Sequence, residues 1–253
     1  MSRLDGKAAF VTGAARGIGS AISHALAREG ATVAIVDVDA EATTQTANEA
    51  NEANGAGRGM PFVCDVSNRN AVFEAMDRFV AQTGGLDVVV NNAVCFHYAP
   101  LPEMPEEAIH RMVDVGLKGV FWVTQAATKH LVARGGGCVI NLSSAAVSFG
   151  IRNAAVYTSI KGAIDAFTRQ QAVELGGYGI RVSAIAPGPV VTPGASSVID
   201  AAGWEARRAR TPLHRLATAD EIAAAVVYLA SEDALSITGI TLKIDGGITV
   251  VGP

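Results

Sequence analysis

Short apolar runs alternate with longer segments of helical pattern along the whole chain. Several of the short runs are β-branched and apolar on both faces, which is typical of strands in a parallel sheet covered on both sides. The sequence predicts strands at Ala8–Val11, Thr32–Val36, Gly59–Val63, Leu86–Val90, Cys138–Leu142, Arg181–Ile185 and Thr241–Ile244.

The segments between these runs predict helices at Gly17–Arg28, Ala40–Ala53, Arg69–Gln82, Glu106–Ala133, Ala154–Leu175 and Ala219–Ala230. Thr218-Ala-Asp-Glu221 has the Thr-x-x-Glu form of a capping box at the start of the last of them. Strand and helix alternate throughout, so we predict an α/β fold with a doubly wound, Rossmann-type parallel sheet. The sheet is expected to have seven strands, with helices on both faces.

No linker, composition break or 20–50-residue repeat divides the chain, so residues 1–253 are expected to form a single domain. Residues 189–216 are the exception to the alternation. They contain three prolines, two glycines and no clear strand. We predict a lid or substrate loop in this segment.

Composition narrows the class of protein. Apolar residues make up 49% of the chain and charged residues 17%, which is enough for a large core. A net charge of −4 argues against nucleic acid or an anionic membrane as a partner. No apolar signal core or membrane span is found, and three separated cysteines favour a reducing cytoplasm over a disulfide framework. No histidine or cysteine pair has metal-ligand spacing, so no metal is expected.

A glycine-rich turn follows the first strand and leads into a helix. Such a turn lets backbone N–H groups approach a pyrophosphate, and the helix N-terminus adds partial positive charge. Its spacing is Gly-x-x-x-Gly-x-Gly, and an ordinary turn is the alternative interpretation. Its position in a βαβ unit favours dinucleotide binding through Gly13, Arg16, Gly17, Ile18 and Gly19.

Asp37 ends the second predicted strand, 18 residues after Gly19. A carboxylate at this position accepts hydrogen bonds from the ribose hydroxyls and repels a 2′-phosphate, which selects NAD(H) over NADP(H). Arg16 could pair with a 2′-phosphate and weakens this choice without reversing it. A surface Asp that only caps the strand is the alternative.

Tyr157 and Lys161 are one helical turn apart, so they share a helix face. A free phenol has a pKa of about 10, and a nearby ammonium would move it toward neutral pH. The pair is common by chance, but Ser143-Ser144 ends the fifth strand at the sheet edge where such folds bind ligands. Ser144 could hold a substrate oxygen against the Tyr157 hydroxyl.

With these motifs, the chain resembles the short-chain dehydrogenase/reductase family over essentially all 253 residues. Ser144 precedes Tyr157 by 13 positions, as in the family pattern. The matching motifs are Thr12–Gly19, Asp65, Asn91-Asn92-Ala93, Ser144, Tyr157/Lys161, Pro187-Gly188 followed by Thr192, and Asp245-Gly246-Gly247.

The resemblance implies a role for each matching residue. Tyr157 would be the general acid/base, Ser144 would orient the substrate, and Lys161 would lower the tyrosine pKa and hold the nicotinamide ribose. Asn91 is instead expected to tie neighbouring strands together. The remaining cofactor contacts implied are Asp65 and Val66 at the adenine, Asn92 near the ribose, the Pro187-Gly188 turn, and Val190 and Thr192 at the carboxamide.

Four positions depart from the family pattern. Gly116 stands where an Asn carbonyl usually holds a water that relays protons to the lysine, and Val94 stands where a glycine is usual. Ser159-Ile160 replaces Ala-Ser before the lysine, and Ser183 replaces an Asn. Glycine still carries a carbonyl, so we expect an active enzyme. A cofactor-binding protein that has lost catalysis is the alternative.

The leading hypothesis is therefore an NAD(H)-dependent alcohol dehydrogenase or ketone reductase, and an NADH-dependent ketoacyl-type reductase is a second. Arg207, Arg208 and Arg210 could receive an acidic carrier or phosphate, but a solvated helix face is favoured. Mostly apolar pocket candidates suggest a cyclic or aromatic alcohol: Cys95, Phe96, Ala146, Phe149, Pro189 and Trp204.

Assembly is suggested by apolar segments that exceed what one sheet face can bury. These are Ala108–Ala133, Ala154–Ala172 and Ile248–Pro253. Extended apolar surface of this kind marks subunit interfaces. Together with the family resemblance, it predicts a homotetramer with 222 symmetry.

Overall fold

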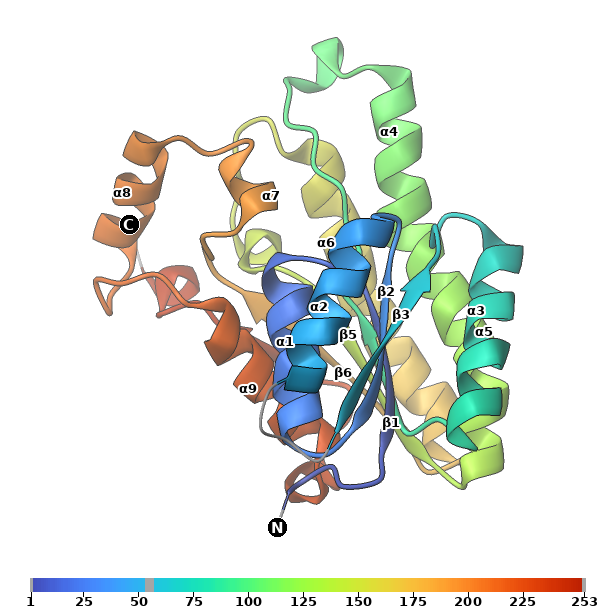
Figure 1. Cartoon of the computed structure of the whole chain (residues 1–253). Coiled ribbons are helices and arrows are strands. Elements are labelled where there is room, and N and C mark those ends of the chain that lie inside the picture. Colours follow the sequence, from blue (N-terminus) through green and yellow to red (C-terminus); the bar gives the residue numbers. More distant parts are fainter. Residues whose placement is uncertain (1, 53–56, 252–253) are drawn as a thin grey trace.

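The computed structural model describes residues 2–52 and 57–251 (Figure 1). Its centre is a seven-stranded sheet in which every pair of neighbours is parallel, in the order β3-β2-β1-β4-β5-β6-β7. The strands are β1 (Ala8–Thr12), β2 (Thr32–Asp37), β3 (Arg58–Val63), β4 (Val88–Asn91), β5 (Gly137–Leu142), β6 (Ile180–Pro187) and β7 (Thr241–Ile244). The order reverses between β1 and β4, which is where such sheets bind ligands.

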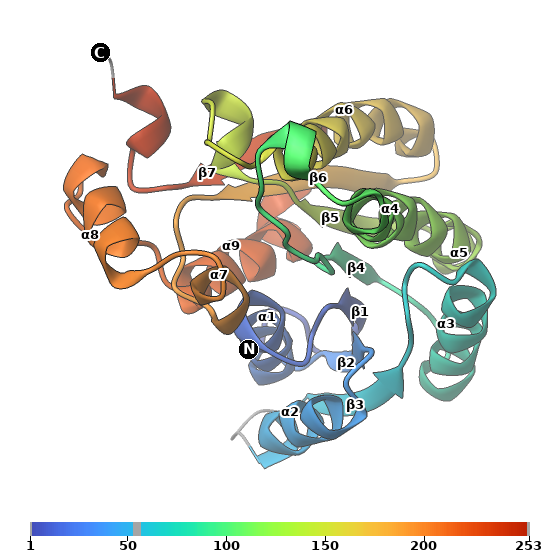
Figure 2. The ribbon, with the colours of Figure 1, turned by 90° about the horizontal axis from the view of Figure 1, so that it is seen from above.

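Helices cover both faces of the sheet, as the sequence predicts (Figure 2). One face is packed by α1 (Gly17–Arg28), α2 (Ala40–Glu52) and α9 (Ala219–Ala230). The other is packed by α3 (Arg69–Thr83), α5 (Gly119–Arg134) and α6 (Ala155–Gly176). The prediction of a doubly wound, Rossmann-type fold is confirmed.

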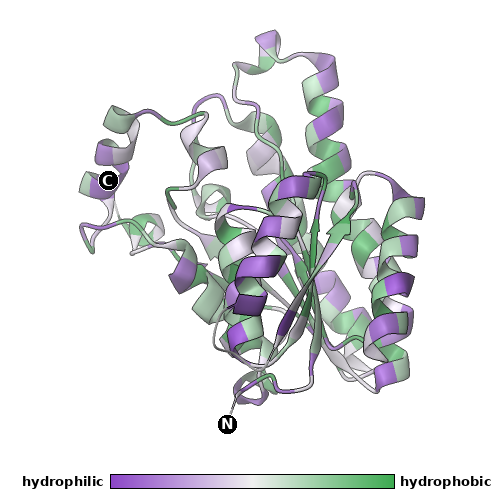
Figure 3. Cartoon of the chain, viewed as in Figure 1, coloured by the Kyte–Doolittle hydropathy of each residue, from purple (hydrophilic) through white to green (hydrophobic). Residues whose placement is uncertain are grey.

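The core follows the hydrophobic pattern of the strands. Phe10 of β1 is buried, and its ring lies 6.0 Å from that of Phe79 on α3, in an edge-to-face arrangement. Hydrophilic residues lie mainly along the outer helices and the loops, and hydrophobic residues predominate in the strands (Figure 3). Within residues 2–52 and 57–251, no helix is long and apolar enough to cross a membrane.

Most predicted boundaries lie within two residues of the observed ones, and the capping box of α9 is formed in full. The predicted end of α2 at Ala53 lies outside the described residues. The prediction of one continuous helix over Glu106–Ala133 was wrong, because the observed helix is interrupted. It consists of α4 (Glu106–Val113), a π-helical turn (Asp114–Lys118) and α5.

The loop expected over residues 189–216 is also more regular than predicted. It contains two helices, α7 (Pro193–Ser196) and α8 (Ala201–Arg210), which lie beside the carboxyl edge of the sheet (Figure 1). Side-chain caps start both helices: Thr192 accepts from Ala195 N at 3.2 Å, and Asp200 accepts from Gly203 N at 2.7 Å. The pattern missed α8 because none of its residues is buried, so it has no apolar stripe.

The remaining short elements are single 3₁₀ turns. They are Leu101–Glu103, Ala145–Ser148, Glu232–Ala234 and Ile248–Val250. Two of them, Ala145–Ser148 and Ile248–Val250, contact each other at the carboxyl edge of the sheet. This contact closes one side of the cavity described next.

Candidate active site

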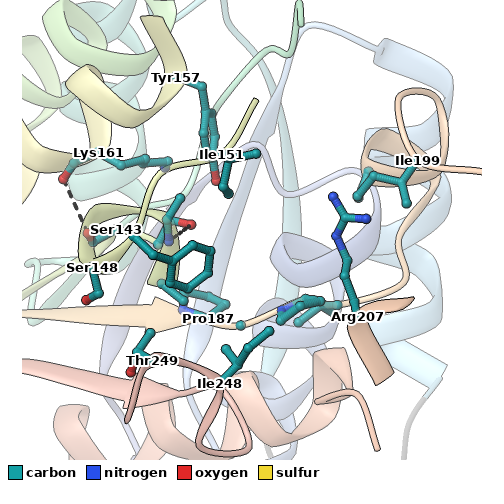
Figure 4. Close-up of a pocket in the computed structure, with 18 of the residues that line it drawn as sticks. Ser143, Ser148, Ile151, Tyr157, Lys161, Pro187, Ile199, Arg207, Ile248 and Thr249 are labelled. Carbon is teal, nitrogen blue, oxygen red and sulfur yellow. Dashed lines mark hydrogen bonds between the residues drawn. The ribbon is translucent and has the colours of Figure 1, made fainter. Parts of the chain in front are cut away.

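A cavity of about 500 Å³ opens at the carboxyl edge of the sheet (Figure 4). Its wall combines the end of β5, the first turn of α6, the chain after β6, and one face of α8. The residues after β7 complete it from the other side. Within the described residues, no group of three or more His, Cys, Asp or Glu side chains could hold a metal ion. The volume of the cavity is in the range of small-molecule sites.

Tyr157 projects its hydroxyl into this cavity from the first turn of α6 (Figure 4). Its ring is packed by Phe96, with ring centres 5.5 Å apart, and by Tyr98, at 5.8 Å. Burial raises the pKa of Tyr157 above its usual value, and hydrogen bonding with Ser144 partly opposes the rise. The phenol is therefore held in its protonated form at neutral pH.

Ser144 reaches the phenol because it caps the 3₁₀ turn that follows β5. Its Oγ accepts from Ala146 N at 3.1 Å, which fixes the side chain at the carboxyl edge of the sheet. Only 9% of Ser144 is exposed, and it lines the cavity together with Tyr157. The structure thus brings the predicted serine and tyrosine to one site.

Lys161 lies one turn beyond Tyr157 and is buried. Its ammonium donates to the Leu142 carbonyl at 2.6 Å, and Ser143 Oγ donates to the Lys161 carbonyl at 3.3 Å (Figure 4). Burial lowers the pKa of Lys161 to about 8, opposed by the charge of Asp165. Two hydrogen bonds therefore join the end of β5 to α6.

The net direction of the Tyr157 pKa differs from the sequence-based expectation. The ammonium of Lys161 lies 5.9 Å from the Tyr157 ring centre and donates to Leu142. Burial is the larger influence on the phenol, so its pKa is raised where a lowering was expected.

The glycine-rich loop between β1 and α1 folds tightly. Gly17 has a φ of +60°, and a Cβ on Gly19 would lie 2.1 Å from the Gly13 carbonyl oxygen. Asn92, after β4, braces the loop by donating from Nδ2 to Gly13 O at 2.8 Å and to Thr12 O at 3.0 Å. Asn92 therefore holds the loop in shape, in addition to lining the cavity.

The N-terminus of α1 is open to an anion. Arg16 occupies the N-cap position without a side-chain cap bond, and the first turn, which includes Ile18, has no acidic residue. The backbone N–H groups there lack helical partners, and the helix end is partially positive. These features fit the pyrophosphate of a dinucleotide.

Asp37 ends β2 beside this loop, at the position expected from the sequence. Its Oδ2 accepts from Ala15 N at 3.2 Å and its Oδ1 from Val38 N at 2.8 Å. The neighbouring Arg16 forms an ion pair with Asp39 at 2.5 Å. The one cation that the sequence offered for a 2′-phosphate is thus paired with a carboxylate.

Asp65 and Val66, predicted at the adenine, follow β3. Asp65 Oδ1 accepts from Ser67 N at 2.9 Å, and its Oδ2 pairs with Arg111 of α4 at 3.0 Å, a partner that the sequence did not reveal. Val66 is buried.

Asn91 joins neighbouring strands, as expected. Its Nδ2 donates to Asn141 Oδ1 of β5 at 2.8 Å and to Thr124 Oγ1 of α5 at 3.2 Å. Asn91 therefore ties β4 to β5 and α5 at the residue next to Asn92.

The chain after β6 contributes a continuous wall of the cavity. Gly188 abuts Asp245, whose Cα would lie 2.6 Å from a Cβ on the glycine. Val190 forms an isolated parallel bridge with Ala217, and Thr192 caps α7. Both contacts hold this stretch in place. Its cavity-lining residues are Pro187, Gly188, Pro189, Val190 and Thr192.

Five of the six predicted pocket residues line the cavity: Phe96, Ala146, Phe149, Pro189 and Trp204. Cys95 does not line it among the described residues, so that prediction was wrong. Its thiol donates to the Arg111 carbonyl at 3.6 Å and packs among core residues, because neighbours along this extended segment point to opposite sides. The lining residues that the sequence did not indicate include Tyr98, Arg152, Ile199, Ile248, Thr249 and Val251, and Arg207 and Arg210 line the cavity where a solvated helix face was favoured.

Two departures from the family pattern lie against each other. Gly116, in the π-helical turn, is buried, and a Cβ there would lie 3.2 Å from Cγ2 of Ile160 on α6. Ile160 occupies the position where serine is usual. Ile160 therefore occupies space that a side chain at position 116 would need, and we predict that the two substitutions compensate for each other. Val94, a third departure, lines the cavity.

This packing predicts a coupled pair. Gly116→Asn alone should lower the free energy of unfolding by about 1–3 kcal/mol, since it overpacks the contact with Ile160. Adding Ile160→Ser should recover stability beyond the sum of the single effects in a double-mutant cycle. Turnover of the stable double variant should stay within about tenfold of the original, because the backbone carbonyl at position 116 is kept. Additive unfolding energies would contradict the compensation.

Known proteins are similar to this chain over nearly its whole length. A family model described as enoyl-(acyl carrier protein) reductase matches residues 13–249. The chain is 38% identical to D-threitol dehydrogenase of Mycolicibacterium smegmatis, over 98% of this chain and 95% of that protein. It is also 38% identical to cis-4-hydroxycyclohexanecarboxylate dehydrogenase of Sinomonas cyclohexanicum, over 97% of each.

A solved structure is similar over nearly the whole length. It is a gluconate 5-dehydrogenase from Burkholderia cenocepacia in complex with NADP and tartrate. The TM-score is 0.92 at 35% identity, covering 99% of this chain and 98% of that one.

Proposed function

Because the chain belongs to the short-chain dehydrogenase/reductase family of oxidoreductases, we propose that it interconverts a small secondary alcohol and its ketone with NAD(H). The observation that carries the proposal is the meeting of Ser144 and Tyr157 in one cavity, above the buried Lys161. The same cavity is lined by Asn92, which braces the glycine-rich loop that leads into α1.

Each side chain has a chemical task in this proposal. Tyr157 donates a proton to the substrate oxygen in reduction and removes it in oxidation. Ser144 holds that oxygen against the phenol, and Lys161 adds positive charge behind it. A bound nicotinamide supplies or accepts the hydride, so the protein contributes position and the proton. The residues suited to hold the cofactor are the glycine-rich loop, Asp37, Asp65, Val66, Asn92 and the stretch from Pro187 to Thr192.

NAD(H) is favoured by charge at the end of β2. Asp37 lies where the adenosine ribose is expected, and the charge of Arg16 is matched by Asp39. A 2′-phosphate would thus meet two carboxylates and no unpaired arginine from this loop. The NADP complex of the related gluconate 5-dehydrogenase makes the cofactor the first property to measure.

We expect kcat/KM with NAD(H) to exceed that with NADP(H) by at least about tenfold, equivalent to about 1.4 kcal/mol. Asp37→Ala should narrow this ratio because it removes the repulsion of the 2′-phosphate. Asp39→Ala, which frees Arg16, should also narrow it. Glu41→Ala, on the first turn of α2, is a charge-matched control that should leave the ratio unchanged. Equal use of both cofactors by the unmodified protein would refute the assignment.

The substrate is expected to have an apolar ring. Aromatic side chains line much of the cavity: Phe96, Tyr98, Phe149 and Trp204. The relative named for cis-4-hydroxycyclohexanecarboxylate supports a cyclic alcohol, whereas the one named for D-threitol indicates that open-chain polyols belong in the same screen. Following NADH absorbance in both directions over cyclic, aromatic and polyol substrates tests the proposal.

The same screen separates the two alternatives. A 3-ketoacyl thioester that reacts better than any simple ketone would favour the ketoacyl-type reductase. Binding of NADH without turnover of any substrate would favour the other alternative, a cofactor-binding protein that has lost catalysis through Gly116. The hydrogen bond from Lys161 Nζ to the Leu142 carbonyl at 2.6 Å supports the active enzyme, because it holds the ammonium beside the cavity.

We also propose a homotetramer with 222 symmetry. Phe121 of α5 is 37% exposed and packs against Phe167 of α6 in a tilted arrangement, with ring centres 5.0 Å apart. Val173, also on α6, is 85% exposed. Such apolar surface on two neighbouring helices is suited to a subunit interface. Of the apolar C-terminal segment, Ile248 and Thr249 line the cavity instead, and residues 252–253 lie outside the described residues.

Light scattering at micromolar concentration should give about four times the 26.0 kDa mass of one chain. Phe121→Glu should lower this mass, because it places a charge in the apolar surface. A monomeric unmodified protein would contradict the proposal.

The expected compartment is the cytoplasm, since Cys64, Cys95 and Cys138 are all free thiols.

A further inference from the structure

The charged side chains of the cavity wall are all positive among the described residues. Its lining includes Arg152, Arg207, Arg210 and Lys161, and within the described part of the chain it includes no Asp or Glu. The protein as a whole carries a net charge of −4, so this is a local reversal of sign. Clefts lined by one sign of charge concentrate ligands of the opposite sign.

Arg207 is the arginine placed deepest in this wall. It is half-buried, whereas Arg152 and Arg210 are exposed. Its guanidinium extends along the cavity beside Ile199 (Figure 4) and lies 6.0 Å from the Trp204 ring centre. One of its nitrogens, Nη1, donates to the Gly203 carbonyl at 2.9 Å, which fixes its direction.

The charge of Arg207 is available to a ligand. Across residues 2–52 and 57–251, no carboxylate lies within ion-pair distance of it. Its neighbour Arg208 is different, because it pairs with Glu205 on the outer side of α8 and is not part of the cavity wall. A guanidinium has five N–H donors, so the bond to Gly203 leaves donors for a bidentate contact.

The positive charge also reaches the reacting end of the cavity. Burial raises the pKa of Tyr98, the nearby Tyr157 adds to the rise, and the charge of Arg207 opposes it. The Tyr98 ring centre is 5.8 Å from that of Tyr157. Arg207, Tyr98 and Tyr157 all line the same cavity of about 500 Å³, a size suited to one small molecule.

The three arginines in the last turn of α8 have an alternative explanation, because positive side chains interact favourably with the partially negative C-terminus of a helix. That explanation accounts for arginines anywhere around the final turn. It does not account for the turning of Arg207 and Arg210 into the cavity while Arg208 pairs outside.

We propose that the substrate is an anion: a compact cyclic or aromatic secondary alcohol, or its ketone, bearing a carboxylate that Arg207 binds. The aromatic wall packs the ring, Ser144 and Tyr157 receive the alcohol oxygen, and Arg152 and Arg210 at the rim attract the charge. This inference rests on the proposed function and names the substrate class of the same site. Planar, bidentate recognition of a carboxylate is the contact to which arginine is best suited.

Matched substrates test the charge directly. The probes are 3- and 4-hydroxycyclohexanecarboxylate and the corresponding uncharged carboxamides, compared by kcat/KM at neutral pH. The unmodified enzyme should prefer the carboxylates by at least about tenfold. Arg207→Gln should reduce this preference at least about tenfold. The matched control Arg208→Gln, on the same helix turn but outside the wall, should leave the preference unchanged.

A binding measurement keeps the inference independent of turnover. Cyclohexanecarboxylate, which has no reacting group, should bind the unmodified protein at least about tenfold more tightly than cyclohexanecarboxamide in calorimetry, and Arg207→Gln should abolish the difference. Turnover of uncharged ketones with no preference for carboxylates would overturn the inference and leave the proposed function standing. Selective carboxylate binding without turnover of any probe would support the inference and count against the proposed function.

Discussion

Turnover of Tyr157→Phe is expected to fall by roughly 10²–10⁴-fold, the usual contribution of general acid–base catalysis. The substitution removes the transferable proton and keeps the ring, which is packed by Phe96 and Tyr98. The cavity should therefore keep its shape, and NADH binding should change little. Steady-state kinetics on any accepted ketone, with NADH binding followed by fluorescence, measures both effects.

Tyr98→Phe is the matched control for this variant. Tyr98 is also buried and also lines the cavity, but its hydroxyl has no assigned proton to transfer. Its removal should change turnover by less than about tenfold. A Tyr157→Phe variant as active as the Tyr98→Phe variant would show that another group supplies the proton. Cys95 is poorly placed for that task, because it lies outside the cavity wall and burial raises its thiol pKa.

The raised pKa of Tyr157 also predicts opposite pH profiles for the two directions. Ketone reduction needs the protonated phenol, so its rate should hold through neutral pH, and loss of the phenol proton should lower it only as pH rises through the raised pKa. Alcohol oxidation needs the ionised phenol, so its rate should increase with pH over the same range. A reduction rate that already declines between pH 6 and 7 would mean that the phenol pKa is lowered in the working enzyme.

Lys161→Met should have the second-largest effect, a loss of at least about a hundredfold in kcat/KM. Methionine has a similar length and no charge, so the phenolate loses the buried cation one turn away. The pKa of Lys161, about 8, makes the cation fully present below that pH and progressively lost above it. If kcat/KM of the unmodified enzyme declines as pH rises through 8, the pH profile of Lys161→Met should lack this decline.

The same variant should be less stable, because the Leu142 carbonyl loses its 2.6 Å donor. A buried acceptor left without a partner costs about 1–3 kcal/mol, which chemical denaturation can measure. NADH affinity should also fall if Lys161 holds the nicotinamide ribose. Lys129→Met, at an exposed ion pair with Asp77, is the control for loss of a lysine. Unchanged activity in Lys161→Met would exclude the buried cation from the chemistry.

Local features of this chain could be inferred from residue order because each depends on near neighbours. The alternation of strands such as Thr32–Val36 with helices such as Gly17–Arg28 follows from apolar periodicity. The spacing of Tyr157 and Lys161 places them on a shared helix face, and a strand that ends just before Ser143-Ser144 places Ser144 at the carboxyl edge of a parallel sheet. These inferences recovered the fold and the grouping of Ser144, Tyr157 and Lys161 at one cavity, and the catalytic roles of the three residues stay predictions.

Other features depend on contacts between distant segments, which periodicity does not contain. Ile160 against Gly116, and Arg111 against Asp65, each bring together residues more than 40 positions apart. Helix α8 was missed because it buries no residue, and the choice between Arg207 facing the cavity and Arg208 facing outward depends on how that helix is placed. The balance of burial over charge at Tyr157 has the same origin, since desolvation comes from every element that surrounds the phenol.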